Sequence, residues 1–211
     1  MKLNKWFVII ILLSIVGTFI VYPNLPDVVP THWNIHGEVD ATGGKATIFI
    51  TAFSPLFIYF LMLVLPKIDP RKEAHKKHKK AYSVITGIII VFFLVIHWLV
   101  ILVSLGYETD IISAIWVLTG ILFIVMGVYL PQVKRNYFLG VRTPWTLSDD
   151  VVWKKTHKLS GILFLLIGLI MAVTSILQAS NIYSYFLISL IVMLIIIFVY
   201  SYLEYKKIHK E

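Results

Sequence analysis

Long apolar runs alternate with short polar segments along the chain. Six runs are as long as the about 17–25 helical residues that cross the hydrocarbon core of a bilayer. They cover residues 6–22, 47–65, 82–105, 111–130, 159–178 and 183–203. A transmembrane barrel needs short segments of alternating polarity, whereas these runs are apolar on every face. The pattern predicts an all-α integral membrane protein with six transmembrane helices.

Composition and charge agree with this prediction. Hydrophobic residues make up 59% of the 211 residues, and cysteine is absent, which excludes disulfides and thiol catalysis. Of the 19 lysines and arginines, all but Lys45 lie in intervals that six helices place on one side of the membrane. The positive-inside rule therefore predicts that both termini are cytoplasmic. The net charge of +8 then reflects topology, and the run "KKHKK" suits anionic lipid headgroups rather than direct contact with nucleic acid.

Two polar intervals are long enough to form folded units, residues 23–46 on the outside and residues 131–158, the motif loop, in the cytoplasm. The chain is accordingly divided into an N-terminal two-helix region, residues 1–81, and a four-helix region, residues 82–211. In the motif loop Gly140 favours a positive φ angle. Thr146 or Ser148 is expected to cap a helix that continues along the membrane surface or into the fifth span.

The outward loop is rich in turn-forming residues, which predicts irregular structure or a short strand. A metal site or a hydrolase would have to use its acidic and histidine side chains, which are His32, His36, Glu38 and Asp40. Two histidines four residues apart share a face only on a helix, and Pro30 and Gly37 disfavour one. We therefore expect neither metal nor cofactor, but a compact cap with Trp33 as its buried anchor.

Within the apolar runs, His97 is the one clearly ionisable side chain. It is either functional or a neutral imidazole bonded to a polar partner such as Ser54 or Thr119. Pro55 should break or kink the second helix, and Ser54 beside it can satisfy the freed backbone groups. No carboxylate lies within the runs, which disfavours proton-coupled transport.

Small residues recur at seven-residue spacing in the fourth and fifth predicted helices, at Gly120, Gly127, Gly161 and Gly168. This spacing is typical of close helix contact, either within one chain or between chains. Arg142 lies between Gly140 and Pro144. It is either an ordinary cytoplasmic cation or a partner for a headgroup phosphate, for helix carbonyls or for a carboxylate such as Asp149.

The stretch "RNYFLGVRTPWTL", followed by "DDVVWKKTHKLSG", resembles the signature of the SdpI family of bacterial membrane proteins. The matching positions are Asn136, Gly140, Arg142, Thr143, Pro144, Trp145, Thr146, Trp153, Lys154 and His157. "LPDVVPTHWNIHGEVD" resembles the small extracytoplasmic domain that accompanies this family. The basic loop "RKEAHKKHKK" departs from the family pattern.

The resemblance implies a non-enzymatic immunity protein of the bacterial cytoplasmic membrane. SdpI-like proteins protect against a secreted hydrophobic toxin peptide, and a family member also holds an ArsR-type repressor at the membrane. We expect the toxin to face Pro30, His32, Trp33, His36, Glu38, Asp40 and His97. Residues 136–157 would form a cytoplasmic latch that reports or stabilises the bound state. The alternative is a small transporter or flippase that uses His97 and Arg142.

Overall fold

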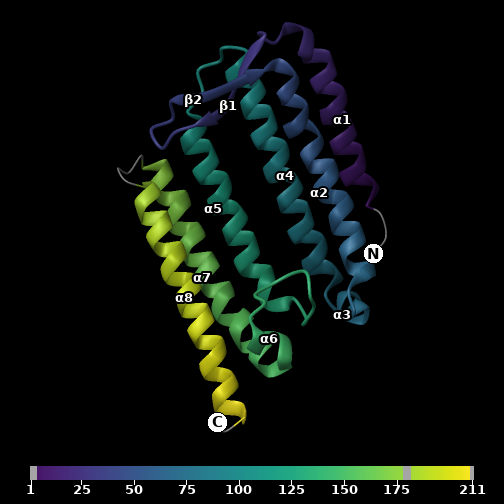
Figure 1. Cartoon of the computed structure of the whole chain (residues 1–211), viewed down its shortest axis with the longest axis vertical. Helices are drawn as coiled ribbons and strands as arrows, with labels where there is room; N and C mark the ends of the chain where they lie inside the picture. Colours follow the sequence, from purple (N-terminus) through teal and green to yellow (C-terminus); the bar gives the residue numbers. More distant parts are fainter. Residues whose placement is uncertain (1–3, 178–181, 210–211) are drawn as a thin grey trace.

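Six long helices build the part of the chain that the structure describes, as the sequence predicts (Figure 1). The structure is a computed structural model and describes residues 4–177 and 182–209. The long helices are α1 (Lys5–Val21), α2 (Ile48–Ile68), α4 (Lys79–Ser104), α5 (Ile111–Tyr129), α7 (Asp150–Ile176) and α8 (Ile182–His209). Each carries a window long and apolar enough to cross a membrane. The prediction of an all-α, multi-pass membrane protein is confirmed.

Short elements mark the two ends of the helical bundle. At the hairpin end, β1 (Val28–Trp33) pairs antiparallel with β2 (Val39–Gly44). At the opposite end, which we call the basic end, α3 (Lys72–Lys77) and α6 (Pro144–Ser148) lie beside the first residues of α1 and the last residues of α8 (Figure 1). The basic end comprises residues 67–80 and 131–158.

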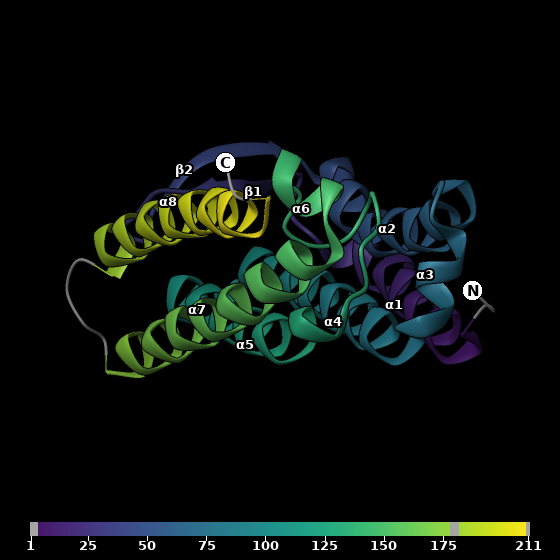
Figure 2. The same cartoon turned by 90° about the horizontal axis from the view of Figure 1, so that it is seen from below.

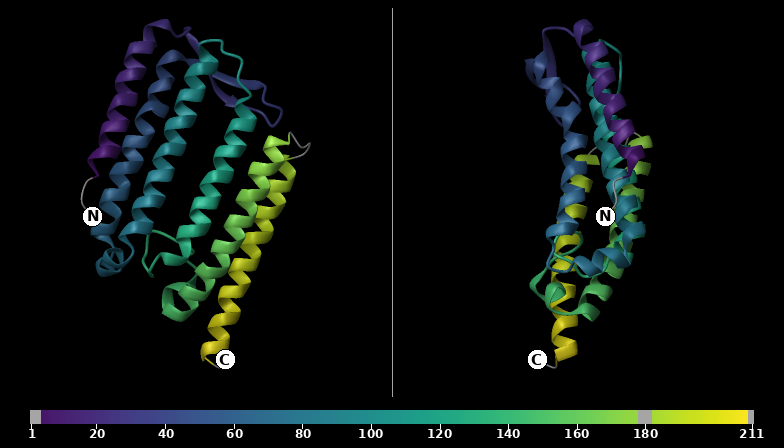
Figure 3. Two further views of the ribbon diagram at one scale, coloured as in Figure 1. Left: turned by 180° about the vertical axis from the view of Figure 1, so that it is seen from behind. Right: turned by 90° about the vertical axis from the view of Figure 1, so that its right-hand side faces the viewer.

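The long helices form two groups, α1, α2 and α4 on one side and α5, α7 and α8 on the other (Figure 2). Seen edge-on, they make a slab that is narrower than it is wide (Figure 3). Each group has its own apolar cluster, around Ile11 and Tyr59 in the first and around Met171 and Met193 in the second. A further cluster around Tyr82 joins α4 to the motif loop and to α7 at the basic end.

The glycines of α5 and α7 bring two backbones into contact. A Cβ atom on Gly127 would lie 2.7 Å from the carbonyl oxygen of Gly161, and one on Gly120 would lie 2.8 Å from that of Gly168. No side chain fits between the helices at these positions. The seven-residue glycine spacing therefore serves a contact within one chain.

Helix α2 runs unbroken from Ile48 to Ile68, with Pro55 inside it. Proline has no backbone N–H, so the carbonyl of Thr51 loses its usual helical donor. The Ser54 hydroxyl donates to that carbonyl at 2.9 Å. The compensation predicted for Ser54 is confirmed. Of the two outcomes predicted for Pro55, a break is wrong and a kink stays a prediction.

Helix α7 begins at Asp150, well before the apolar run, and continues straight into the span. Its cap is Asp149, whose carboxylate accepts hydrogen bonds from the backbone N–H groups of Val151 at 2.7 Å and Val152 at 2.9 Å. The prediction that Thr146 or Ser148 caps this helix is wrong. Both residues lie inside α6, and the chain becomes extended only at Asp149.

Candidate functional site

Asn136 organises the motif loop from the inside. Its side chain is fully buried. The amide oxygen accepts from the backbone N–H groups of Phe138 at 2.9 Å and Leu139 at 2.7 Å, and the amide nitrogen donates to the carbonyls of Lys134 and Leu139, each at 2.8 Å. With both atoms of its amide bonded to backbone, Asn136 serves to fix the loop, and its amide has no open side for a ligand.

Gly140 and His157 meet where the loop touches α7. Gly140 has the predicted positive φ, at 116°. A Cβ atom there would collide with Nε2 of His157 and with the Trp153 ring. Nε2 instead accepts from the backbone N–H of Val141 at 3.0 Å, while Nδ1 lies 2.9 Å from the Trp153 carbonyl. An N–H can only donate and a carbonyl only accept, so these contacts require a neutral imidazole protonated on Nδ1.

The segment after Gly140 docks α6 onto α8. Thr143 and Thr146 form a capping box, in which the Thr146 N–H donates to the Thr143 hydroxyl at 3.2 Å and the Thr143 N–H donates to the Thr146 hydroxyl at 2.9 Å. Pro144 occupies the first turn of α6. The Thr143 hydroxyl also donates to Ser201 of α8 at 3.0 Å, and the Trp145 ring packs on Phe198 with centroids 5.0 Å apart.

The two charged motif side chains, Arg142 and Lys154, are exposed. Arg142 donates from Nη1 to the Tyr137 carbonyl at 2.6 Å and lies at an apolar groove of about 580 Å³ between α7 and α8. Asp149, one of the alternative partners predicted for Arg142, does not pair with it; the Asp149 carboxylate caps α7 instead. Lys154 makes no hydrogen bond or ion pair within the part of the chain that the structure describes.

A buried cluster that the sequence did not predict ties the basic loop to the motif loop. The Asp69 carboxylate is fully buried and accepts from the backbone N–H of Arg71 at 2.7 Å, from that of Tyr137 at 3.0 Å and from Nε2 of His75 at 2.8 Å. His78 accepts from the Lys134 N–H at 3.1 Å. We call Asp69, His75 and His78 the loop clamp. A lone aspartate just after an apolar run, within a strongly basic loop, was its one sequence signal.

The surroundings of the loop clamp set its charge states. Burial by itself raises the pKa of Asp69, but the hydrogen bonds from His75, Arg71 and Tyr137 outweigh it and leave the pKa below its ordinary value. Burial, together with the neighbouring His75 and Lys134, lowers the pKa of His78 to about 4. At neutral pH the clamp therefore combines an ionised carboxylate with a neutral His78.

The β-hairpin is much more open. His32 and Asp40 pair at 2.5 Å with both side chains exposed, and the Asn34 side chain holds the turn by accepting from the N–H groups of His36 and Glu38. Trp33 is only half-buried, against a cluster that includes Ile48. In residues 4–177 and 182–209, no three histidine, aspartate or glutamate side chains are grouped to hold a metal ion.

Beneath the hairpin lies a cavity of about 620 Å³, which we call the hairpin cleft. Its lining includes apolar and aromatic side chains of three elements, Trp33 and Ile35 from the hairpin, Ile115 and Trp116 from α5 and Tyr183 from α8. Of the residues predicted to face a toxin, His32, Trp33 and Asp40 line this cleft. Pro30, His36, Glu38 and His97 do not.

The sequence around both the motif loop and the hairpin matches known protein families. The profile of the SdpI/YfhL protein family matches residues 132–201, which contain most of the motif loop, and that of a domain of unknown function (DUF1648) matches residues 9–58, which contain the hairpin. The chain is 29% identical over 209 residues to Immunity protein SdpI of Bacillus subtilis (strain 168), with 99% of each chain covered. Together these matches make the chain similar to the SdpI family over nearly its whole length. No solved structure matches it.

His97 joins three helices. Its Nε2 lies 2.8 Å from the Thr18 hydroxyl of α1, and its Nδ1 lies 2.9 Å from the Thr51 hydroxyl of α2. The predicted partners were wrong, because the hydroxyls of Ser54 and Thr119 donate to carbonyls of their own helices. The side chain is fully buried, and both ring nitrogens are engaged.

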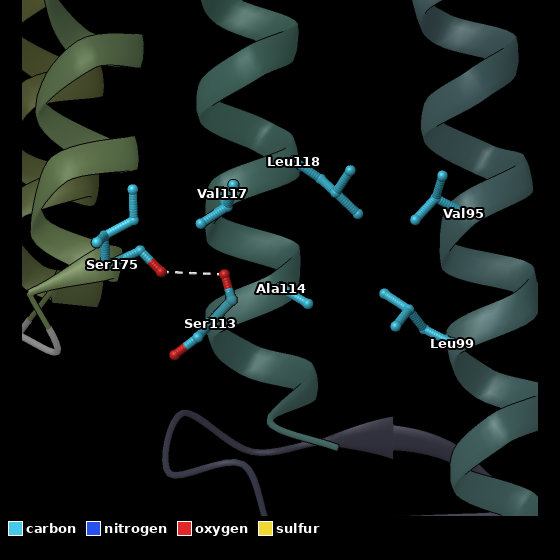
Figure 4. Close-up of a pocket in the computed structure, with 8 residues that line it drawn as sticks. Val95, Leu99, Ser113, Ala114, Val117, Leu118 and Ser175 are labelled. Atoms are coloured by element: carbon cyan, nitrogen blue, oxygen red, sulfur yellow. Dashed lines mark hydrogen bonds between the residues drawn. The ribbon is translucent and has the colours of Figure 1, made fainter.

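A second apolar cavity opens between α4 and α5 (Figure 4). In this lateral crevice of about 430 Å³, Val95 and Leu99 of α4 face Ala114 and Leu118 of α5. At its edge, the Ser175 hydroxyl donates to the Ser113 carbonyl at 3.0 Å. Since the first turns of α5 also line the hairpin cleft, two apolar cavities flank the same stretch of helix.

Proposed function

We propose that this protein is an immunity protein that binds and neutralises a secreted, membrane-active killing peptide. The observation that carries the proposal is the match to Immunity protein SdpI over 99% of both chains. That alignment extends through the residues of the hairpin, the lateral crevice and the motif loop. The proposed location is the bacterial cytoplasmic membrane, with the basic end and both termini in the cytoplasm.

The hairpin cleft is the proposed binding site for the killing peptide. Its aromatic and aliphatic lining suits the apolar side chains of a membrane-active peptide, and the exposed His32–Asp40 pair offers polar contacts at the rim. The lateral crevice lies beside the same turns of α5 and is the proposed apolar route from the membrane. A peptide could therefore be captured from outside the cell or from within the outer leaflet.

The motif loop is the proposed latch on the cytoplasmic side. Asn136, His157 and the Thr143–Thr146 box fix its conformation through bonds that leave little freedom. The exposed Arg142 and Lys154 are then available for contacts beyond the fold. A repressor of the ArsR type is the proposed cytoplasmic partner. The division of the chain into a two-helix region, residues 1–81, and a four-helix region, residues 82–211, stays a prediction.

Survival of a sensitive cell tests the proposal. A Bacillus subtilis strain that lacks its own SdpI would express the wild-type protein, Ile35→Asn or Val28→Asn at matched membrane abundance. Ile35 and Val28 are both 58% exposed on the hairpin, but only Ile35 lines the hairpin cleft. We expect wild type and Val28→Asn to protect the cells from the secreted killing peptide, and Ile35→Asn to protect them less.

The outcomes separate function from location. If wild type gives no protection, immunity against this peptide is wrong. If Ile35→Asn and Val28→Asn protect equally, immunity stands but the hairpin cleft is not the binding site. Arg142→Ala, compared with Lys158→Ala as a second exposed cation of the motif loop, tests the latch. Equal protection by these two variants would reduce Arg142 to a topological charge.

A further inference from the structure

A cleft of about 610 Å³ lies between the basic loop and the motif loop, and we call it the basic cleft. Its walls come from α3, from the segment after α5 and from the first turn of α7. The loop clamp holds these walls together, because Asp69 accepts from Tyr137 and His78 accepts from Lys134. The basic cleft is therefore formed before any ligand arrives.

The two acidic side chains of the basic cleft are already paired. The Asp150 carboxylate lies 2.5 Å from Nε of Arg135 and 3.7 Å from Nη1 of Arg71. Glu73 pairs with Lys76 at 2.6 Å. Both carboxylates that line the cleft, and both of its arginines, are therefore already in ion pairs.

Three further cations remain around the basic cleft, Lys77, Lys134 and Lys154. All three are exposed, and none makes an ion pair within the described residues. Lys154 is also a motif residue, and its side chain makes no hydrogen bond or ion pair within the described residues. Its neighbour Trp153 donates to the Val133 carbonyl and contributes an apolar surface to the same cleft.

Three lysines around one cavity match a ligand with several anionic oxygens. A phosphate group supplies them, and lysine binds phosphate as a mobile point charge without needing fixed geometry. The basic cleft also lies where spanning helices end, the level at which lipid phosphates are found. We propose that the basic cleft binds a phosphate group, held by Lys77, Lys134 and Lys154, from either an anionic phospholipid or a soluble phosphate ester.

The test uses the purified full-length protein and two probes. For the lipid source, native mass spectrometry would count phosphatidylglycerol retained from nanodiscs that also contain phosphatidylcholine. For the soluble source, thermal stability in phospholipid-free detergent would be followed as glycerol phosphate is added. The variant K77Q/K134Q/K154Q is compared with K79Q/K80Q/K158Q, which removes the same charge from exposed lysines of the basic end that do not line the cleft.

We expect the cleft variant to bind one of the two probes at least about tenfold more weakly than the control variant and wild type, with a difference that shrinks at high salt. Loss of phosphatidylglycerol identifies the lipid source, and loss of glycerol phosphate alone identifies the soluble source. Equal behaviour of the two variants toward both probes overturns the proposal. So does binding of a polyglutamate peptide that depends on the cleft lysines when neither phosphate probe binds. No readout involves the killing peptide, so these results are independent of the proposed immunity function.

Discussion

An aspartate and a histidine pair at each end of the molecule, but the two pairs differ in burial. Asp69 and His75 lie 2.8 Å apart with side-chain exposures of 0% and 9%, whereas Asp40 and His32 lie 2.5 Å apart with exposures of 44% and 68%. Water competes for both partners of the exposed pair, so that pair contributes little to stability. The buried carboxylate has no such competitor and must keep its protein donors.

The same contrast extends to the surroundings of the two pairs. At the basic end, Asn136, Thr146 and His157 are fully buried and hydrogen-bonded. At the hairpin end, most side chains of both strands are exposed around an open cleft. Ordered polar networks suit a region that must hold one conformation, and an open apolar cleft suits a region that receives a ligand.

Removing the buried carboxylate should have the largest effect. Asp69→Ala leaves the N–H groups of Arg71 and Tyr137 and the His75 ring without their acceptor. We expect a loss of about 3–5 kcal/mol in the free energy of unfolding, measured by denaturation in detergent. Glu73→Ala, which removes an exposed carboxylate at the same end, is the control. Equal losses for the two variants would contradict a special role for the loop clamp.

Glycine substitutions should show that tight packing is not confined to the basic end. Gly127→Ala and Gly120→Ala each push a methyl group into the backbone of α7, and we expect losses of about 1–3 kcal/mol for both. Thermal melting in detergent measures them against Gly44→Ala, where no heavy atom lies within 4 Å of the new Cβ. A neutral Gly120→Ala would mean that the helices separate more easily toward the hairpin end.

Acid should weaken the loop clamp through His78. The pKa of His78 falls from its ordinary 6.5 to about 4 in the folded chain, because burial disfavours the charged ring. Between these values only the unfolded chain takes up the proton. The contribution of neutral His78 to the free energy of unfolding is therefore fully present above pH 6.5. It decreases as the pH falls toward 4, by at most about 1.4 kcal/mol per pH unit.

His78→Asn tests this pH dependence, because asparagine can still accept from the Lys134 N–H but does not titrate. Unfolding in detergent at pH 7, 6 and 5 should show a shallower pH slope for the variant than for wild type. Equal slopes would mean that the acid sensitivity comes from other groups.

Removing the exposed carboxylate should have the smallest effect. Asp40→Ala breaks only the exposed pair with His32, and we expect a change below about 1 kcal/mol. The same denaturation assay measures it. A loss that approaches that of Asp69→Ala would remove the contrast between the two ends of the molecule.

Local and periodic features were readable from the sequence. Helix number, the compensation of Pro55 by Ser54 and the positive φ of Gly140 each depend on residues close together in the chain or on a repeated pattern. The predicted first residues of the helices were less accurate. Asp149 takes the cap in place of Thr146 because the chain makes a short helix first, and that helix depends on contacts with α8.

Hydrogen-bond partners that lie far apart in the sequence could not be predicted from it in the same way. His97 was recognised as a buried polar group, yet its partners Thr18 and Thr51 come from two other helices whose rotation no local pattern fixes. Almost nothing in the sequence indicated that Asp69 is buried and hydrogen-bonded, because the backbone N–H of Tyr137 that donates to it lies 68 residues away. The same holds for the basic cleft, whose lysines come from two loops that are separate in the sequence.

The sequence by itself determined that this chain spans a membrane six times and where its charges concentrate. Apolar length and the distribution of lysine and arginine are additive properties, and each segment carries them whatever its neighbours do. Only the tertiary structure decided which polar groups meet in the loop clamp and which lysines surround one cleft. Those contacts depend on how the helices pack against each other, and a hydrogen bond tolerates only a few tenths of an ångström.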